Sequence, residues 1–375
     1  MADSSGAPAP RPSVERPSVV VVGGGYAGIR VAKGLDDVAD VTLVDPKENF
    51  VHNVAAWRAL VEPSWLDTIF MPYARLLRAG RHRRDRVAKA DGTTVTLASG
   101  ETLTPDYLVL ATGSAYPFPA KLEIADAAEA RERVLAAHAD LLAAQDVLIV
   151  GAGPSGLELA GEIASFFPTK SVAIADVGPD ILPGPFDPEV RAELRRQLDA
   201  FGVTFVLGQP LAGLDAPGTP EPARRGPVEL RVGEDGTLRA DIWFQAFGVR
   251  PHSGYLVGPL ADARDGQGNL RVSPSLRVAG QERVFALGDL ADADRKMAGI
   301  ASRQAEVVVA NIQSLIEGGP GADTYEPMPP GILVPLGPAG GAGQLPGAGV
   351  VGAETASQYK GRDLMVDHFA TLFDA

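Results

Sequence analysis

The sequence predicts an α/β protein with two nucleotide-binding units, because one pattern of strand, glycine-rich turn, helix and strand occurs twice. The first copy runs from SVVVV through GGGYAG, and the second runs from VLIV through GAGPSG. In each copy the last strand ends at an aspartate, Asp45 in the first and Asp176 in the second. Two such units in one chain imply two bound dinucleotides.

The first unit begins with a short β-branched run at Ser18–Val22, which stops at three glycines. An apolar-periodic stretch from Tyr26 to Leu35 then predicts a helix, and Val41–Val44 predicts a second strand. Asp45 directly follows that strand. The order and length of these segments are those expected of a βαβ unit.

The glycines of the first unit fit the motif G-x-G-x-x-G at Gly23, Gly25 and Gly28. The first glycine permits the turn, the second lets the backbone approach a pyrophosphate, and the third lets helix and strand pack closely. Phosphate then lies at the helix N-terminus, where free N–H groups favour anions. Asp45 is placed to accept hydrogen bonds from ribose hydroxyls. An ordinary glycine turn is the alternative, but it does not explain the complete series of elements.

The second unit repeats every element of the first. Its strands are expected at Val147–Val150 and Val172–Ala175, and its helix runs to about Phe167. The three glycines of its motif are Gly151, Gly153 and Gly156.

Nucleotide choice in the second unit depends on Asp176. A carboxylate at this position suits a free 2′-hydroxyl and repels a 2′-phosphate, so NADH is favoured over NADPH. Lys170 and the arginines from Arg191 onward leave NADPH as an alternative. A plain turn acid is the other interpretation of Asp176.

The remaining segments give a coarser pattern of expected elements. Helices are expected at 121–145 and 301–316, and the C-terminus ends in a further helical segment. Glycine- and proline-rich stretches predict a meander at 209–240 and a linker with a short hairpin at 318–352. Extended structure is expected in four places, a hairpin at 87–97 and strands at 107–112, 242–247 and 284–287.

The composition indicates a globular protein and excludes several chemistries. With 375 residues, of which 45% are hydrophobic and 22% charged, the chain can bury the cores of two or three domains. The absence of cysteine excludes a disulfide framework, a thiolate nucleophile, a Cys-ligated metal and a dithiol relay. The five histidines lack the paired spacing of a helical metal site, so we expect no metal.

Charge and hydropathy bear on partners and location. Lys and Arg number 34 against 47 Asp and Glu, and the formal net charge of −13 opposes non-specific attraction to nucleic acid. The most apolar run, VLIVGAGPSGLELAGEIASFF, contains two glutamates, so we expect no transmembrane segment. The proline-rich residues 1–17 lack the apolar core of a signal peptide, which predicts a disordered tail on a cytoplasmic protein.

Several segments together resemble a known family. LVLATGS (Leu108–Ser114) and VFALGDLAD (Val284–Asp292) look like two-dinucleotide flavoprotein reductases of the glutathione-reductase fold. LVDPKENFVHNVAAWRALVE, ATGSAYPFPAK, GPSGLELAGEI, RKMAG and KGRDLMV are most similar to ferroptosis suppressor / AIF-like mitochondrion-associated flavoproteins, NADH:quinone reductases related to type II NADH dehydrogenases. The resemblance spans about residues 18–366.

The resemblance implies a domain plan. It has two Rossmann-like dinucleotide-binding domains of glutathione-reductase type, with a small C-terminal region of β-hairpin and helix. We expect the FAD-binding domain at 18–118 and 263–325, the NADH-binding domain at 119–262, and a C-terminal region near the flavin and acceptor site at 326–375.

The same resemblance implies which residues hold FAD. The first glycine motif and Asp45 would hold its ADP half, and Val87 would present its backbone to the adenine. The ATGS segment adds Thr112 and Gly113, and Asp289 would bind the ribitol or pyrophosphate side. The helix after Lys296, Met297 and Ala298 would point its N–H groups at the flavin and stabilise the reduced ring.

The resemblance also implies three catalytic residues. It places Glu158 beside the nicotinamide, although an acid on an ordinary helix surface is the alternative. His52 corresponds to a segment beneath the flavin ring and could relay a proton, or merely form hydrogen bonds. Lys360 matches a lysine near the flavin, with a solvated lysine as the alternative. Gly248, in AFGVRP, resembles the loop that crosses NADH.

The function implied is that of an FAD-dependent oxidoreductase, which takes hydride from NADH and passes two electrons to a quinone-like acceptor without a redox disulfide. One alternative is a ferredoxin or rubredoxin reductase that docks through the basic run Arg81–Lys89, and another is an AIF-like redox signalling flavoprotein. Basic residues also leave transient membrane contact open, but the apolar face of the last helix favours packing onto the body of the protein. The sequence does not specify an oligomeric state.

Overall fold

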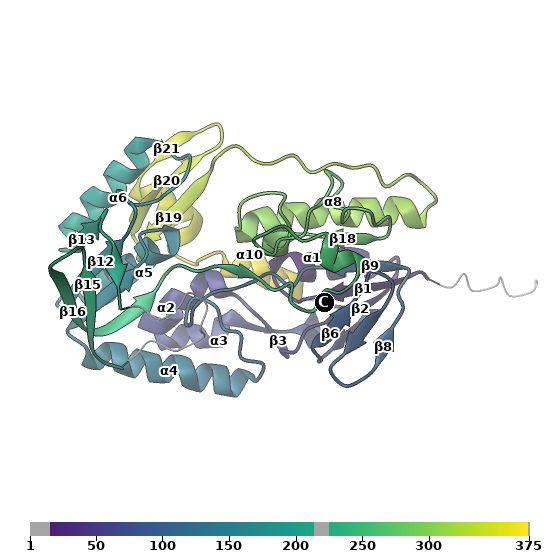
Figure 1. Cartoon of the computed structure of the whole chain (residues 1–375), viewed down its shortest axis with the longest axis horizontal. Coiled ribbons are helices and arrows are strands. Elements are labelled where there is room, and N and C mark those ends of the chain that lie inside the picture. Colours follow the sequence, from purple (N-terminus) through teal and green to yellow (C-terminus); the bar gives the residue numbers. More distant parts are fainter. Residues whose placement is uncertain (1–15, 214–224, 374–375) are drawn as a thin grey trace, which may run out of the picture.

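Two separate β-sheets lie at opposite ends of the long axis of the molecule (Figure 1). The computed structural model describes residues 16–213 and 225–373. Of the expected N-terminal tail, residues 1–15 lie outside the described residues. Helices pack against both sheets, which confirms the α/β fold class.

The first sheet is entirely parallel, because each of its strands returns through a crossover. Its order is β18 (Val284–Ala286), β9 (Tyr107–Leu110), β1 (Ser18–Val22), β2 (Asp40–Val44) and β5 (Arg81–Arg83). One face packs on α1 (Tyr26–Leu35) and α8 (Ala298–Ile316). The other packs on a three-stranded sheet of β6 (Val87–Ala90), β7 (Val95–Leu97) and β8 (Thr102–Leu103).

The second sheet has four parallel strands and an antiparallel extension. Its order is β13 (Thr204–Leu207), β12 (Ser171–Asp176), β11 (Asp146–Val150), β16 (Gly236–Gln245), β15 (Arg225–Val232) and β14 (Leu211–Ala212). Three helices contribute to the core on one face, α4 (Ala127–Ala143), α5 (Pro154–Phe166) and α6 (Pro188–Ala200).

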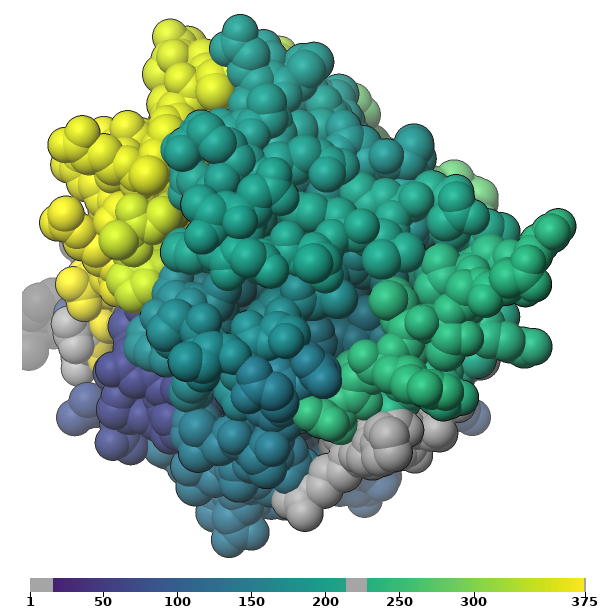
Figure 2. Space-filling view, turned by 90° about the vertical axis from the view of Figure 1, so that its left-hand side faces the viewer, coloured from purple at the N-terminus to yellow at the C-terminus, as the bar shows by residue number. Residues whose placement is uncertain are grey.

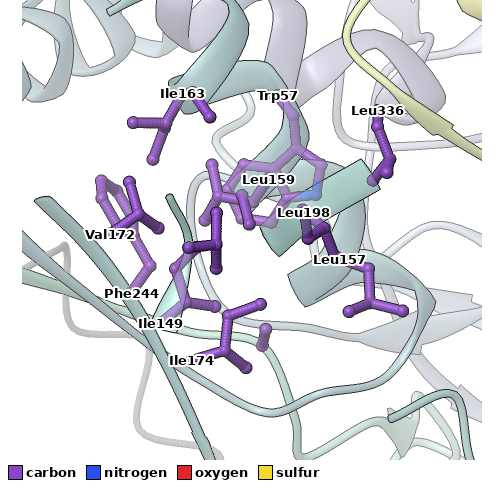
Figure 3. Close-up of a cluster of buried hydrophobic side chains, with 14 of the residues drawn as sticks. Trp57, Ile149, Leu157, Leu159, Ile163, Val172, Ile174, Leu198, Phe244 and Leu336 are labelled. Carbon is purple, nitrogen blue, oxygen red and sulfur yellow. The ribbon is translucent and has the colours of Figure 1, made fainter. Parts of the chain in front are cut away.

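Several short elements lie outside the two sheets. After β2 the chain forms β3 (Asn49–Val51), α2 (Ala56–Val61), α3 (Leu66–Ile69) and β4 (Phe70–Pro72). The strand β10 (Ser114–Ala115) pairs with β17 (Arg250–Pro251), and α7 (Pro259–Asp262) follows. Trp57 of α2 lies in the same buried cluster as Leu157 of α5 and Phe244 of β16 (Figure 3). The segment after β2 is therefore packed into the core of the second unit.

The C-terminal region differs from the expected linker and hairpin. It forms a three-stranded antiparallel sheet of β19 (Ile332–Leu336), β20 (Gly340–Leu345) and β21 (Gly349–Val351). Leu336 packs in the cluster around α5 (Figure 3). The expected single final helix is divided into α9 (Ala353–Ala356), a π-helical turn at Ser357–Gly361 and α10 (Val366–Ala370). Leu364 and Met365 have positive φ, and this left-handed turn separates the last two pieces.

Two further elements differ from expectation. The helix expected at 121–145 is α4, which begins at Ala127. Asp126 caps it by accepting a hydrogen bond from the Glu129 N–H over 3.0 Å. The strand expected at 242–247 is the second half of β16, which starts at Gly236 and pairs with β15 as a hairpin. Of the expected meander, residues 214–224 lie outside the described residues.

Candidate functional site

A cavity of about 740 Å³ is lined by residues of both glycine loops and by segments that follow strands of both sheets. This volume is typical of cofactor sites. Thirteen of the residues singled out from the sequence line it: Gly23, Gly25, Asp45, Val87, Thr112, Gly113, Gly153, Glu158, Asp289, Lys296, Met297, Ala298 and Lys360. Six others are outside its lining: Gly28, His52, Gly151, Gly156, Asp176 and Gly248. Residues from distant parts of the chain therefore converge on one space.

The first glycine loop is shaped for an anion. A Cβ on Gly28 would lie 1.8 Å from the Gly23 carbonyl oxygen, so this glycine permits close packing of α1 on β1. A Cβ on Gly25 would meet nothing within 4 Å, so that position opens onto the cavity. Gly25 is also the N-cap of α1, and no side chain caps the helix. Free N–H groups and space thus occur together, as a pyrophosphate requires.

The second glycine loop has the same construction. A Cβ on Gly156 would lie 1.9 Å from the Gly151 carbonyl oxygen, and one on Gly153 would meet nothing within 4 Å. Gly153 is the N-cap of α5 and, as in the first loop, no side chain caps the helix. Both loops therefore fit a dinucleotide phosphate.

Each terminal aspartate holds its own glycine loop. Asp45 accepts hydrogen bonds from the backbone N–H groups of Gly24 at 2.7 Å and Lys47 at 2.9 Å. Asp176 accepts them from Ala152 and Gly178, both at 2.7 Å. A carboxylate has about four lone-pair positions, so these bonds leave capacity for ribose hydroxyls. Asp176 lies outside the cavity lining, so its contact with a ribose remains a proposal.

Asp289 is part of a network that sequence reasoning missed. Its Oδ2 accepts hydrogen bonds from Ser114 Oγ at 2.6 Å and from Lys121 Nζ at 3.0 Å. Burial alone would raise the pKa of Asp289, but Lys121 and Ser114 outweigh it and hold the pKa below its usual value. Ser114 and Lys121 both lie in the segment ATGSAYPFPAK, so the motif contained the signal.

The N-terminus of α8 faces the cavity, with Met297 as N-cap and no side-chain cap. Lys296 stands just before it and donates to Asn269 Oδ1 at 2.7 Å and to the Asp289 carbonyl. Burial lowers the pKa of Lys296. Its ammonium and the helix dipole both place positive charge at this wall, which suits electron-rich ligand atoms.

Glu158 and Lys360 form an ion pair at the cavity wall. Lys360 Nζ donates to Glu158 Oε1 at 2.6 Å, and the two side chains are 18% and 15% exposed. Lys360 belongs to the π-helical turn and Glu158 to α5. The pairing of these two residues was not evident from the sequence, where they belong to different segments of the resemblance.

His52 does not reach the cavity. It is fully buried and lies in contact with the ring of Tyr26, which does line the cavity. Its Nε2 is 2.7 Å from the Leu364 carbonyl and its Nδ1 is 3.3 Å from the Tyr26 hydroxyl. Burial lowers the pKa of His52 to about 4. This geometry favours the hydrogen-bonding alternative over the proton relay, and Tyr26 is the residue that sequence reasoning missed here.

Hydrogen bonds join the ATGS segment to the segment around His252. Thr112 Oγ1 donates to the His252 carbonyl at 2.8 Å, and the His252 N–H donates to the Gly113 carbonyl at 3.0 Å. Gly248 lies outside the lining, although its neighbour Val249 is part of it. The segment 248–252 therefore borders the cavity through Val249 and His252 instead of through the expected glycine.

The basic run Arg81–Lys89 is largely neutralised. Arg81 pairs with Asp40 at 3.1 Å, Arg84 pairs with Glu48 at 3.1 Å, and Arg83 pairs with Glu101. Such exposed pairs add little stability, but their acids lower the net positive charge that this run presents to a docking partner.

Within residues 16–213 and 225–373, no group of three or more His, Cys, Asp or Glu residues is arranged to hold a metal ion. None of the helices described there is both long enough and apolar enough to cross a membrane. The C-terminal end packs onto the protein body, since Phe369 of α10 and Phe373 of the following 3-10 turn are buried in the cluster of the first sheet.

Comparison with known proteins gives consistent matches over nearly the whole chain. The model of the pyridine nucleotide-disulphide oxidoreductase family matches residues 17–311. The chain is 31% identical to human Ferroptosis suppressor protein 1 over 93% of both chains, and 28% identical to Apoptosis-inducing factor homolog B of Dictyostelium discoideum over 95% of this chain and 96% of that protein. These relatives confirm the resemblance predicted from the motifs.

Solved structures share the fold at low sequence identity. NDH2 from Plasmodium falciparum in complex with NADH matches with a TM-score of 0.74 at 14% identity, over 92% of this chain and 93% of that chain. The sulfide:quinone oxidoreductase of Aquifex aeolicus matches with a TM-score of 0.75 at 17% identity, over 96% and 91%.

Proposed function

Because this chain belongs to the pyridine nucleotide-disulphide oxidoreductase family, we propose that it is an FAD-dependent enzyme that oxidises NADH and reduces a quinone-like small molecule. The observation that carries the proposal is the single cavity bordered by both uncapped helix N-termini, at Gly25 and Gly153. The chain has no cysteine, so the proposed electron path contains no redox disulfide.

The residues around the first glycine loop fit FAD. The N-terminus of α1 would bind its pyrophosphate and Asp45 its ribose, while Val87 would contact the adenine. Asp289 and the N-terminus of α8 would hold the other half of the molecule. Bound FAD would supply the hydride-accepting and electron-transferring chemistry that the side chains lack.

The residues around the second glycine loop fit NADH. The N-terminus of α5 would bind the pyrophosphate, and Asp176 the adenine ribose. Glu158 and Lys360 would hold the nicotinamide end in a fixed orientation. The nicotinamide ring would then be held in position to react with the flavin. Both cofactor sites open onto the same cavity.

The quinone-like acceptor is the finer part of the proposal and follows from the family resemblance. A ferredoxin or rubredoxin reductase would need an accessible basic surface, but three arginines of the run Arg81–Lys89 already pair with acids. An AIF-like signalling role has in its favour the match to Apoptosis-inducing factor homolog B, which supports the enzyme equally. We therefore retain the small-molecule acceptor.

An acceptor panel tests this choice. Protein reduced anaerobically with NADH is mixed in turn with a short-chain ubiquinone, a menaquinone analogue, a ferredoxin and oxygen, and the return of oxidised flavin absorbance is followed. We expect the quinones to reoxidise the flavin fastest. Reoxidation that depends on ferredoxin would contradict the proposed acceptor.

A further inference from the structure

A second ion pair lies directly behind the pair at the cavity wall. Arg58 of α2 is bidentate toward Glu162 of α5, with Nε 2.6 Å from Oε2 and Nη2 2.8 Å from Oε1. The same Nη2 donates to the Gly361 carbonyl at 3.0 Å. Both side chains are nearly inaccessible, at 2% and 3% exposure.

This arrangement joins three distant segments of the chain. Glu162 follows Glu158 by one turn of α5, so the two carboxylates lie on the same face of the helix. Gly361 directly follows Lys360 in the π-helical turn. Early, central and C-terminal parts of the chain meet on one face of the molecule (Figure 2). Arg58 thus holds the backbone next to Lys360 against the helix that carries Glu158.

The geometry argues for a role beyond stability. A buried ion pair must overcome a large desolvation cost, and apolar residues of similar volume often stabilise a protein as well or better. A planar guanidinium with several fixed donors, in contrast, determines the relative positions of its partners. The rings of Trp65 and Phe166 pack on the guanidinium and restrict it further. Their centroids lie 5.1 and 5.4 Å from Arg58 Cζ.

The segment that Arg58 holds has an unusual backbone. Ser357–Gly361 forms a π-helical turn, in which the Arg362 N–H donates to the Ser357 carbonyl at 3.0 Å. Such turns are rare and occur often at functional sites. Ser357 Oγ also donates to the Pro338 carbonyl at 2.7 Å. Arg58 and Ser357 therefore fix opposite ends of the turn that presents Lys360.

We infer that Arg58, through Glu162 and the Gly361 carbonyl, is a positioning residue that fixes Lys360 against Glu158 at the nicotinamide end of the cavity. The inference rests on the proposed function, because it assigns Lys360 and Glu158 to the binding of NADH. Arg58 itself is outside the cavity lining and acts only through these partners.

The test uses the double variant Arg58→Met/Glu162→Leu. A single Arg58→Met change would leave Glu162 as an unpaired buried charge, whereas the double change replaces the pair by apolar side chains and preserves the fold. The control is Arg131→Met, which removes an arginine that pairs with Asp67 at 3.0 Å and packs on Phe70 at 4.7 Å, away from the cavity.

Two measurements are made on the FAD-loaded protein. Amide hydrogen exchange in residues 353–364, measured without NADH, should be roughly ten- to a hundredfold faster in the double variant, because a charged hydrogen bond to the turn is lost. Reduction of the flavin by NADH should slow about tenfold, and adding Lys360→Met should slow it no further, because both changes remove one function. The control should match the wild type in both measurements.

The two measurements separate the possible failures. Unchanged exchange in residues 353–364 would overturn the anchoring by Arg58. Faster exchange with a normal reduction rate, or slowing that adds to that of Lys360→Met, would overturn the positioning role. A wild-type flavin that NADH does not reduce would contradict the proposed function and the positioning role together, while the exchange measurement would still decide the anchoring.

Discussion

Lys360 donates a hydrogen bond to Glu158 over 2.6 Å and so joins two residues that are 202 positions apart in the chain. The pair stands at the wall of the cavity, where the C-terminal region meets the helix after the second glycine loop. Each side chain provides the other's counter-charge. A role for one residue in the reaction therefore implies a role for the other.

We predict that Glu158→Gln and Lys360→Met slow the reduction of bound flavin by NADH to a similar extent, about tenfold or more, because each removes one of the two opposite charges of the ion pair. The double variant should be no slower than the slower single variant. Stopped-flow absorbance of the flavin measures all three rates.

A pair outside the cavity lining provides the control. Arg196 and Glu193 pair at 2.7 Å on α6, with side chains 67% and 28% exposed, and removal of Arg196 should leave the reduction rate unchanged. If the effects of Glu158→Gln and Lys360→Met multiply, the two residues act independently and the coupled role is wrong.

The glycine loops give a prediction that separates the two cofactors. Gly25→Ala and Gly153→Ala should both fold, because the added Cβ meets nothing within 4 Å and the glycines have ordinary φ values of −77° and −74°. Gly25→Ala should weaken FAD retention, whereas Gly153→Ala should keep FAD and raise the KM for NADH, each by roughly tenfold for a modest loss of contact. Flavin content after gel filtration and steady-state kinetics measure the two effects.

A third glycine serves as the contrasting case. Gly28→Ala should fail to fold or lose much stability, because its Cβ would lie 1.8 Å from the Gly23 carbonyl oxygen. Loss of FAD from Gly153→Ala, with normal FAD in Gly25→Ala, would reverse the assignment of the two sites.

Nucleotide choice is predicted to depend on the charge of Asp176. Asp176→Asn can keep an acceptor oxygen for the Ala152 N–H, which lies 2.7 Å from Oδ2 in the native protein, but it loses the acceptor for the Gly178 N–H together with the negative charge. The ratio of kcat/KM for NADH over NADPH should fall roughly tenfold or more, because a carboxylate near a phosphate costs binding energy. Asp180→Asn is the matched control, because it also removes a carboxylate, but one whose charge already pairs with Arg195 at 2.8 Å. It should leave the ratio unchanged. An unchanged ratio in Asp176→Asn would rule out its role in selection.

The buried His52 predicts a pH dependence of stability. Its pKa is about 4 in the folded protein and about 6.5 when unfolded, so between these values the unfolded state binds more protons. Stability should therefore fall as the pH decreases from about 6.5 to 4, with His52 contributing up to about 1.4 kcal/mol per pH unit. The contribution is complete above the unfolded value and is lost within this window.

Denaturant unfolding at several pH values measures this effect. His52→Gln should show a shallower decline than the wild type, while His138→Gln, which removes a histidine outside this cluster, should decline like the wild type. Reoxidation of the flavin by a quinone should remain within about twofold in His52→Gln, because the ring does not reach the cavity. Equal slopes in wild type and His52→Gln would contradict the buried neutral state.

The local pattern of the sequence was sufficient for the elements that carry the glycine loops. Ser18–Val22 and Tyr26–Leu35 have the bounds expected, because apolar period and glycine breaks both act within a few residues. Asp289 and Met297, which line the cavity, were likewise expected near the cofactor from the motif resemblance.

Relationships between distant residues were not accessible in this way. The contact of Arg58 with Gly361 depends on how α2 and the C-terminal turn pack on α5, which no local period encodes. His52 was placed in the right segment, but its burial behind Tyr26 depends on α10 and on the turn at Leu364. The division of the last helix depends on the left-handed backbone at Leu364 and Met365, for which no glycine gave a signal.

Anaerobic titration of the purified protein with NADH is the decisive test of an FAD-dependent NADH oxidoreductase. We expect the protein to carry FAD, a stoichiometric amount of NADH to bleach the flavin absorbance, and a quinone then to restore it. Protein that neither contains nor takes up FAD, or a bound flavin that stays oxidised in excess NADH, would show that the proposed function is wrong.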